Sequence, residues 1–488
     1  MSGKACLTER ITAAMTGNGK GKRLMSLALA LASLSFVTTG SAQTYNWQGP
    51  DTGDWNTPAN WNDTVPGPAD TAVLSDTSGA GATVNLDADV TVMGLQYNGL
   101  VSTQTIASTG NHSLSITKND TDLAVMTAKT LVIGSGATVN CNSTGGGAST
   151  VLIDNGGTLK VTGTVNANGP AGPGIWTTVG AGKGGPSTLI LAEAGVWNQN
   201  HSFINVGEAG PEQGVLILRD TAQLNTLQVV LGTYWGYPKA FVYQQGGTVT
   251  LNLYSDPDSR EWFFPAAVPA LLLGGANETD WGADSAGKGE YHLSGGTLST
   301  PSVGGGLNPR GDSTFYFDGG TLLASGGDSE IPSDGWQTVF MANVRHVLVR
   351  NGAVVDTGTN SITIAQNLEH DPDLGATVDG GLDKKGSGTL TVIGNATYTG
   401  PTVVEAGVLS VGTSAGIPAT DLEIHDGAQV NLPAGVNVAV ETLTFAGVKQ
   451  ASGTWGATDS GATHIDDTHF TGTGVLTVAW HGMLILMK

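Results

Sequence analysis

Three pairs of acidic residues stand close enough in the sequence to raise the question of acid–base chemistry on a polysaccharide. Hydrolysis of a glycosidic bond needs two carboxyl groups about 5 to 10 Å apart on one face of the protein. The local pairs are Asp256 with Asp258, Asp371 with Asp373, and Asp466 with Asp467. The first two are Asp-Pro-Asp segments, which favour turns, and adjacent residues of a strand point to opposite faces. We therefore expect structural carboxylates and predict no catalytic residue.

The histidines are scattered through the chain and show no HExxH pattern or other paired-ligand spacing of a zinc site. His464 and His469 flank Asp466 and Asp467, but so polar a segment is typical of a turn. The run Gly304 to Gly306 lacks the Lys-Ser/Thr continuation of a phosphate-binding loop. We expect no metal and no cofactor at these positions.

One acidic segment leaves calcium open as an alternative. Asn277, Glu278, Asp280 and Asp284 lie in a Gly-rich stretch, and their hard oxygen atoms are the ligands that Ca²⁺ prefers. Their spacing matches neither an EF-hand nor a Gly-rich nonapeptide repeat. The sequence favours a solvated loop here and assigns no metal.

Aromatic residues gather near the start of the chain and in one irregular segment. Trp47, Trp55 and Trp61 stand among Asn, Asp, Gly and Pro, and either form a flat platform for sugars or pack as an end cap. The cap is the favoured interpretation. Residues 256–284 predict an irregular insertion, in which Trp262 and the apolar run Val268 to Leu273 pack over the side of the fold.

The elements that carry these residues are short strands joined by a repeated phrase. The phrase is an alternating strand, two polar residues, a small pair that is usually glycine, then Thr and an apolar residue. It reads VLIDNGGTL at Val151–Leu159, FVYQQGGTV at Phe241–Val249, EYHLSGGTL at Glu290–Leu298 and TFYFDGGTL at Thr314–Leu322. Glycine permits the positive φ of a tight bend, so each phrase predicts a corner between two strands.

The spacing of these corners predicts an all-β protein, a right-handed parallel β-helix with an N-terminal cap. Successive small pairs are about 20 to 50 residues apart, mostly near 24 or a multiple, which suits the rungs of a coil. Stacked rungs bury one continuous core and need no break into globular domains. A β-sandwich array or a propeller is the alternative, although propeller blades would repeat more evenly.

Composition and charge exclude several classes of function. The chain has 488 residues, 73 of them glycine, and a net charge of −21. A field of that sign repels phosphate backbones, so we expect no nucleic-acid partner. Without residues 1–42, which hold five of the 20 basic residues and one of the 41 acidic ones, the net charge becomes −25. So few basic residues also disfavour a polysaccharide lyase, which needs Arg or Lys at its active site. Because Cys6 lies within residues 1–42, Cys141 has no cysteine left to form a disulfide with in the mature chain.

The N-terminus has the three parts of a secretory signal peptide. Lys20, Lys22 and Arg23 precede the apolar run Leu24 to Val37, and small residues end at Ala42. We predict cleavage after Ala42, with Met15 as an alternative start. The apolar run is shorter than the roughly 20 residues of a membrane-spanning helix, so no span is expected in the mature chain. The protein is predicted to be secreted or held at the cell surface.

A stretch near the C-terminus resembles the autotransporter-associated β-strand repeat. Residues 380–411 read GGLDKKGSGTLTVIGNATYTGPTVVEAGVLSV. The matching positions are Lys385, Gly386, Gly388, Thr389, Leu390, Gly394, Asn395, Tyr398, Thr399, Gly400, Thr402, Val404, Gly407, Leu409 and Val411. Pro401, Val403 and Val408 depart from the pattern. The segments Asp54–Trp61 and Ser452–Val478 are similar to other exported proteins that carry such repeats.

The resemblance implies an extracellular β-helical protein with no assigned chemistry. It is similar to the passenger part of an autotransporter without the translocator barrel, since only a few residues follow the last repeat strand, and we expect that this chain does not export itself. The predicted division is 1–42 signal peptide, 43–100 Trp-rich cap and first strands, 101–379 rungs with the insertion at 256–284, 380–411 repeat, 412–479 C-terminal rungs, and 480–488 tail.

The sequence therefore predicts a non-catalytic, exported structural or adhesive surface protein. The alternative is a polysaccharide-binding or polysaccharide-degrading β-helix, in which the insertion and nearby aromatic residues form a groove. Extracellular polysaccharide and cell-surface components are the expected kinds of partner. The oligomeric state stays open.

Overall fold

The structure is a computed structural model that describes most of the chain after residue 41. The described residues are 42–50, 52–74, 82–97, 103–117, 123–125, 129–142, 150–167, 176–182, 184–208 (200 and 201 by backbone only), 210, 213–232, 237–252, 269–274, 287–306, 311–331 and 337–479. Residues Ala42–Lys488 form one compact unit. The predicted leader and the predicted tail lie outside the described residues.

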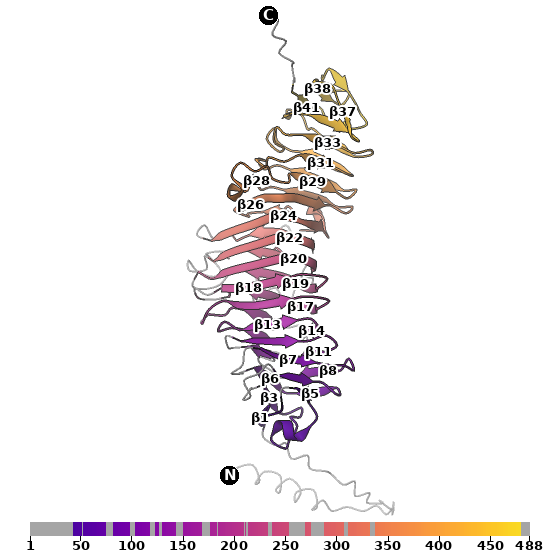
Figure 1. Ribbon diagram of the computed structural model, residues 1–488. Coiled ribbons are helices and arrows are strands. Elements are labelled where there is room, and N and C mark those ends of the chain that lie inside the picture. The colour runs from indigo at the N-terminus through magenta and orange to yellow at the C-terminus, as the bar shows by residue number, and fades with distance from the viewer. Residues whose placement is uncertain are drawn as a thin grey trace, which may run out of the picture. The chain divides into compact units, whose positions relative to one another are not determined.

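Three ladders of parallel strands build the coil, and each strand pairs with the strand one rung before it and one rung after it (Figure 1). Ladder A runs the whole length. It consists of β1 (Thr44–Asn46), β3 (Thr71–Leu74), β6 (Gly94–Tyr97), β9 (Leu123–Val125), β12 (Val151–Ile153), β15 (Thr177–Val179), the ends of β17 (Val196–Val206) and β19 (Gln223–Leu231), β21 (Leu271–Leu273), β23 (Val303–Gly305), β25 (Met341–Ala342), β27 (Ser361–Ile364), β30 (Thr389–Val392), β32 (Val408–Val411), β34 (Gln429–Asn431) and β40 (Phe470–Thr471).

Ladder B forms the second face and stops at β28, before the region of the predicted repeat. It consists of β2 (Thr52–Asp54), β4 (Thr83–Asn85), β7 (Thr103–Ala107), β10 (Thr130–Ile133), β13 (Thr158–Val161), β16 (Ser187–Leu191), β18 (Gln213–Leu218), the first halves of β20 (Lys239–Leu251), β22 (Lys288–Thr300), β24 (Asp312–Ala324) and β26 (His346–Asp356), and β28 (Glu369–His370). Figure 1 shows β18, β20, β22, β24 and β26 stacked in chain order.

Ladder C forms the third face. It consists of β5 (Val90–Val92), β8 (Ser113–Ile116), β11 (Thr138–Cys141), β14 (Thr164–Asn166), the first halves of β17 and β19, the second halves of β20, β22, β24 and β26, and then β29 (Leu382–Lys385), β31 (Thr402–Val404), β33 (Leu422–Ile424) and β36 (Leu443–Phe445). Three parallel ladders that share one chain path confirm the predicted all-β parallel β-helix.

The core lies inside the coil because apolar residues alternate with polar ones along each strand. In β13, Leu159 and Val161 are buried while Thr158 and Lys160 face outward. The same alternation on all three ladders sends Val, Leu and Ile into one continuous apolar cluster from Trp47 to Val478. Burial of this kind contributes roughly 25 cal/mol for each Å² of apolar surface removed from water.

Glycine makes the predicted corners tight. Gly247, in the corner between the two halves of β20, has φ of +67°, and a Cβ there would lie 2.2 Å from the carbonyl oxygen of Ala222 in the previous rung. A side chain at this position would therefore be excluded both by backbone conformation and by the neighbouring chain. The corner sequence sets how closely two rungs stack.

The rungs change composition where ladder B ends at β28. Beyond it, chain segments from Leu382 to Val411 form only strands of ladders C and A, joined by short corners at Gly386 and Gly407. Loops without strand pairing occupy the side where ladder B lies in the earlier rungs, apart from a single bridge between Leu368 and Ala396. The region of the predicted repeat is therefore a two-ladder version of the coil.

The C-terminal end departs from the predicted rungs of 412–479. Stacked rungs continue through β36 and β40, but a separate four-stranded sheet follows, made of β35 (Asn437–Val440), β41 (Val475–Val478), β38 (Gly453–Gly456) and β39 (His464–Ile465). In it β38 and β41 are antiparallel, as are β36 and β37 (Val448–Lys449). Antiparallel strands cover the open end of a coil, whose last rung would otherwise expose unpaired backbone groups.

The described residues hold three 3₁₀ turns as their only helical elements: η1 (Pro58–Trp61), η2 (Asp328–Glu330) and η3 (Pro372–Leu374). None of these helices is long or apolar enough to cross a membrane.

The predicted insertion at 256–284 needs correction, because a rung strand lies within it. Leu271–Leu273 form β21 of ladder A, and all three leucines are buried. Leu271 and Leu273 face the core, whereas Leu272 joins Val230, Trp176 and Phe203 in a second apolar cluster on the outer side of the ladder. Because both sides of the strand are covered, its sequence lacks the polar alternation that would have marked it as a rung.

Candidate functional site

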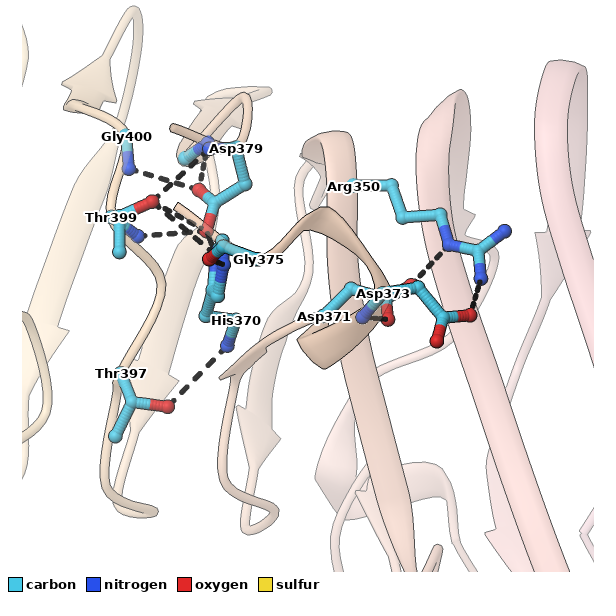
Figure 2. Close-up of polar contacts among 10 residues, drawn as sticks. Arg350, His370, Asp371, Asp373, Gly375, Asp379, Thr397, Thr399 and Gly400 are labelled. Atoms are coloured by element: carbon cyan, nitrogen blue, oxygen red, sulfur yellow. Dashed lines mark hydrogen bonds and ion pairs between the residues drawn. The ribbon is translucent and has the colours of Figure 1, made fainter. Parts of the chain in front are cut away.

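The pair Asp371 and Asp373 is held by one arginine and does not form an acid–base pair. Asp371 is buried and Asp373 is 81% exposed, and both carboxylates contact the guanidinium of Arg350, the second through Nη2 at 3.1 Å (Figure 2). Asp371 also begins η3 and accepts a hydrogen bond from the backbone N–H of Asp373 at 3.0 Å. The predicted turn is confirmed.

Asp466 and Asp467 lie in the turn between β39 and β40 (Phe470–Thr471) and bind different neighbours. Asp466 accepts hydrogen bonds from the backbone N–H groups of Thr468 and His469, at 2.8 and 3.1 Å, and contacts Nδ1 of His469 at 2.9 Å. Asp467 accepts the N–H of Thr458 at 2.8 Å. The structure thus uses the two carboxylates to tie separate turns, as the sequence predicted.

His464 does not join this cluster. Its ring stacks on Trp455, with 4.5 Å between ring centroids. Among the described residues, no group of three or more His, Cys, Asp or Glu side chains could hold a metal ion. The candidate calcium segment at 277–284 and the pair Asp256 and Asp258 lie outside the described residues.

The three N-terminal tryptophans form a packed cap. Trp47, Trp55 and Trp61 are at most 1% exposed, and the ring of Trp61 lies 5.0 Å from that of Trp47 and 4.7 Å from that of Trp55. Nε1 of Trp61 donates to the carbonyl of Trp55 at 2.7 Å. Rings so enclosed offer no face to a sugar, which confirms the cap and rejects the platform.

A strip of stacked rings lies on the outer side of ladder B. Tyr243, His292 and Tyr316 occupy matching positions of three successive rungs, with ring centroids 4.8 and 4.1 Å apart. The guanidinium carbon of Arg350 lies 4.6 Å from the centre of the Tyr316 ring. Because each ring covers the face of the next, this strip also leaves little room for a sugar to stack.

Charged residues flank the strip and neutralise one another. Glu290 contacts Nζ of Lys288 at 2.6 Å and Nε2 of His292 at 3.1 Å. Burial would raise the pKa of Glu290, but the hydrogen bonds from His292 and Lys288 outweigh it and hold that pKa below its ordinary value. The acid stays ionised and paired, which does not suit a proton donor.

His370 and Asp379 form a second polar cluster on the loop that follows ladder B (Figure 2). Nδ1 of His370 is 2.6 Å from Oδ2 of Asp379, and Thr399 donates its hydroxyl to the same oxygen at 3.0 Å. A nucleophilic triad would place the hydroxyl on the far nitrogen of the ring. Here Nε2 instead faces the carbonyl of Gly375 at 3.1 Å. The cluster is therefore a structural clamp.

Asp379 closes the gap that the end of ladder B leaves. Its buried carboxylate accepts backbone N–H groups of Gly381, Thr399 and Gly400 at 3.0, 2.8 and 2.9 Å. Burial would raise the pKa of Asp379, but the hydrogen bond from His370 and these backbone donors lower it. The residue joins the loops that precede β29 and β31 on successive rungs.

A lysine is buried inside the two-ladder coil. Lys384 is fully buried, and its Nζ donates to the carbonyls of Lys385, Gly386 and Ala406 at 2.8, 2.8 and 3.0 Å and to Oγ1 of Thr357 at 3.1 Å. Burial lowers the pKa of Lys384 to about 8. The ammonium thus binds the corner of the repeat from within.

Lys385, the neighbour of this buried lysine, is one of the positions that match the repeat pattern in the sequence. Lys385 is partly exposed and pairs with Asp383 and Glu405, each at 3.3 Å. The alternation that starts with the buried Leu382 sends every second side chain inward, so it would have identified Lys384 as the inner residue.

Ladder C carries a line of hydrogen-bonded asparagines on its outer side. Asn140, Asn166, Asn198 and Asn225 occupy matching positions of four successive rungs. Each amide Nδ2 donates to Oδ1 of the residue one rung earlier, at 2.8, 2.9 and 2.9 Å for the three steps. The amides are oriented before any ligand arrives, and they remain half-buried.

Comparison with known proteins locates one repeat and one distant relative. Residues 382–411 match the family model described as passenger-associated-transport-repeat, which confirms the repeat predicted at 380–411. The Adhesin BmaC autotransporter of Brucella suis biovar 1 (strain 1330) is 31% identical over 133 residues, which make up 27% of this chain and 4% of that adhesin. No solved structure matches the chain. The chain therefore carries a passenger-type β-strand repeat.

Proposed function

We propose that this chain is an exported, non-catalytic scaffold that adheres to other surface components. One observation carries the proposal: every rung from β8 to β24 presents uncharged side chains, mostly Ser, Thr, Asn and Gln, at matching outward positions of ladder C. Such a surface makes many weak contacts in parallel, and their sum gives strong attachment through multivalency.

The similar proteins support adhesion and export. The matched family is a repeat of autotransporter passengers, and the relative is named an adhesin. The matched stretch covers little of that adhesin, so the partner it binds is not carried over to this chain. Surface display or secretion is the compartment that both similarities favour.

The contacts of the acidic residues support a non-catalytic role. Asp371 and Asp373 are neutralised by Arg350, Asp466 and Asp467 hold turns, and Glu290 is paired with Lys288. A glycosidase needs one carboxyl group that keeps its proton near neutral pH. Hydrogen bonds instead hold the pKa values of Glu290, Asp466 and Asp467 below their ordinary values.

Export by the predicted leader completes the proposal. Cleavage after Ala42 would release a chain that starts at Gln43, directly before β1. Mass spectrometry of the exported protein tests this site, and a mature N-terminus at any other residue would reject it.

Adhesion is tested with beads that carry the purified chain. Coated beads are expected to attach to cell monolayers or to polysaccharide-coated surfaces, while beads coated with the heat-unfolded chain are not. The same protein is incubated with a polysaccharide panel, with and without Ca²⁺, to measure reducing ends and unsaturated products. Product release that disappears with D371N or D466N would contradict the non-catalytic role.

A further inference from the structure

The outer side of ladder C carries no charge over eight successive rungs. From β8 to β24 its outward residues are Ser113, Ser115, Thr138, Asn140, Thr164, Asn166, Val196, Asn198, Gln223, Asn225, Thr248, Thr250, Thr297, Ser299, Thr321 and Leu323. We call this set the neutral face. All sixteen residues are half-buried or exposed, so the face is open to solvent.

Ladder C differs in this respect from ladder B. On the same rungs the outer side of ladder B carries Lys160, Lys239, Lys288, Glu290 and Asp312. The outer side of ladder A is covered from β15 to β21, because its outward residues there, Thr178, Asn205, Val230 and Leu272, are fully buried. A chain of net charge −21 thus presents one open face that is polar but uncharged.

The neutral face is also regular. Its columns run from rung to rung without a register shift within ladder C, as in Thr138, Thr164 and Asn140, Asn166. Neighbouring strands are about 4.8 Å apart and alternate residues of a strand about 6.6 Å apart, so hydroxyl and amide groups form a two-dimensional array. The spacings of this array are therefore those of the β-sheet backbone itself.

The asparagine line keeps spare hydrogen-bonding capacity. Each amide has two N–H donors and an oxygen with two lone pairs, and the line uses one donor and one lone pair of the inner residues. A second N–H and a second lone pair remain for a ligand. Since the amides are already held in place, binding costs little further side-chain entropy.

We infer that the neutral face binds an insoluble, uncharged polysaccharide whose hydroxyl groups repeat along a flat surface. Such a polymer offers donors and acceptors at regular intervals and brings no charge that would need a partner. An acidic polymer would meet the negative field of the chain without any cation on this face. The inference rests on the proposed adhesive function and names the ligand class of that function.

Retention on insoluble polymers tests the inference. The purified chain is mixed with microcrystalline cellulose, chitin or insoluble β-1,3-glucan, and separately with polygalacturonate gel, and the bound fraction is measured at low and high salt. Retention on at least one neutral polymer, unaffected by salt, is expected. Contacts between uncharged groups are little screened by ions, whereas ion pairs are.

Two matched double variants locate the surface. Thr248 and Thr297 are paired neighbours on the neutral face, and Thr158 and Thr188 are paired neighbours on the outer side of ladder B. T248K/T297K is expected to lower the association constant about tenfold or more by removing hydrogen bonds and bringing in ions that must be desolvated. T158K/T188K is expected to leave it unchanged.

A second variant guards against misfolding. T248V/T297V removes only the hydroxyl groups and keeps the β-branched shape that suits a strand, and its thermal midpoint is checked against the wild type. It should also weaken retention. Equal losses in the two lysine double variants, or no retention on any neutral polymer, would overturn the inference.

Two further outcomes are distinguishable. If chain-coated beads attach to cells but the protein is not retained on neutral polymers, the inference fails and the adhesive function stands. If neither occurs, both fail. A protein that is excluded from polysaccharide but retained on ice, with loss in T248V/T297V, would assign the array to frozen water and likewise overturn the polysaccharide inference.

Discussion

Nδ1 of His370 lies 2.6 Å from Oδ2 of Asp379, at the level of the coil where ladder B ends. The other ring nitrogen faces the carbonyl of Gly375. Both partners only accept hydrogen bonds, so the ring satisfies them only when both of its nitrogens carry protons.

This contact makes stability depend on the protonation of His370. The hydrogen bond to Asp379 raises the pKa of His370 above its ordinary value. The clamp therefore stabilises the fold fully below the unfolded pKa, about 6.5, and loses this contribution as pH rises through the folded pKa. Urea unfolding of wild type and H370Q should show a difference in unfolding free energy that is largest below about pH 6.5 and shrinks as the pH rises above it.

Replacing Asp379 should be far more damaging than replacing its neighbour in the same loop. In D379N the amide nitrogen would face N–H groups that now donate to the buried carboxylate, and His370, whose side chain is 18% exposed, would lose its charged partner. We expect D379N to lose about 3 kcal/mol of unfolding free energy. D373N removes a carboxylate that is 81% exposed and should cost less than about 0.5 kcal/mol. Equal losses in the denaturation curves would contradict the clamp.

The two lysines of the repeat should respond differently to alkaline pH, because their pKa values are shifted in opposite directions. The pKa of Lys384 is lowered to about 8 by burial, whereas interaction with Asp383 raises that of Lys385. Between about pH 8 and pH 10 the unfolded chain holds a proton on Lys384 that the folded chain has released, so wild type gains stability relative to K384M. K385M provides the control, because that lysine stays protonated in the folded chain over this range. A flat difference between wild type and K384M would reject the lowered pKa.

Two glycine corners allow the effect of backbone conformation on stability to be measured separately from the effect of steric crowding. Gly247 and Gly427 have φ of +67° and +80°, but only at Gly247 would a Cβ meet the neighbouring rung, at 2.2 Å from Ala222 O. We expect G427A to cost about 1 to 2 kcal/mol for its left-handed conformation, and G247A to cost clearly more. Thermal unfolding of both variants measures the difference, and comparable midpoints would show that the corner can open.

Sequence reasoning succeeded where a pattern of two residues was enough. Alternation, as in Leu159 and Val161, identified inward positions, and the glycine phrases identified corners. The tryptophan cap was foreseen because three large apolar rings near the start of a solenoid have no other place to be buried. These features depend on neighbours in the sequence and on one repeating geometry.

Features that depend on distant segments were missed. The antiparallel pairing of β38 with β41 has the same alternation as a rung, so the strand pattern does not tell its direction. His370 and Asp379 meet because the eight residues between them fold back, and the hydrogen bonds of Lys384 depend on Ala406 in the next rung. The neutral face emerged only when strands were placed in register.

The stacking of rungs has a mechanical consequence. In register, Thr130 pairs with Thr158, so one turn of the coil holds 28 residues. Tension between the two ends of the coil would act along the hydrogen bonds that join rungs, so turns would detach from an end in sequence. Each detached turn would add about 90 Å of extended chain. A coil that links a cell to a surface would therefore lengthen in steps under tension. Each step would absorb mechanical work before the contacts between the protein and the surface break.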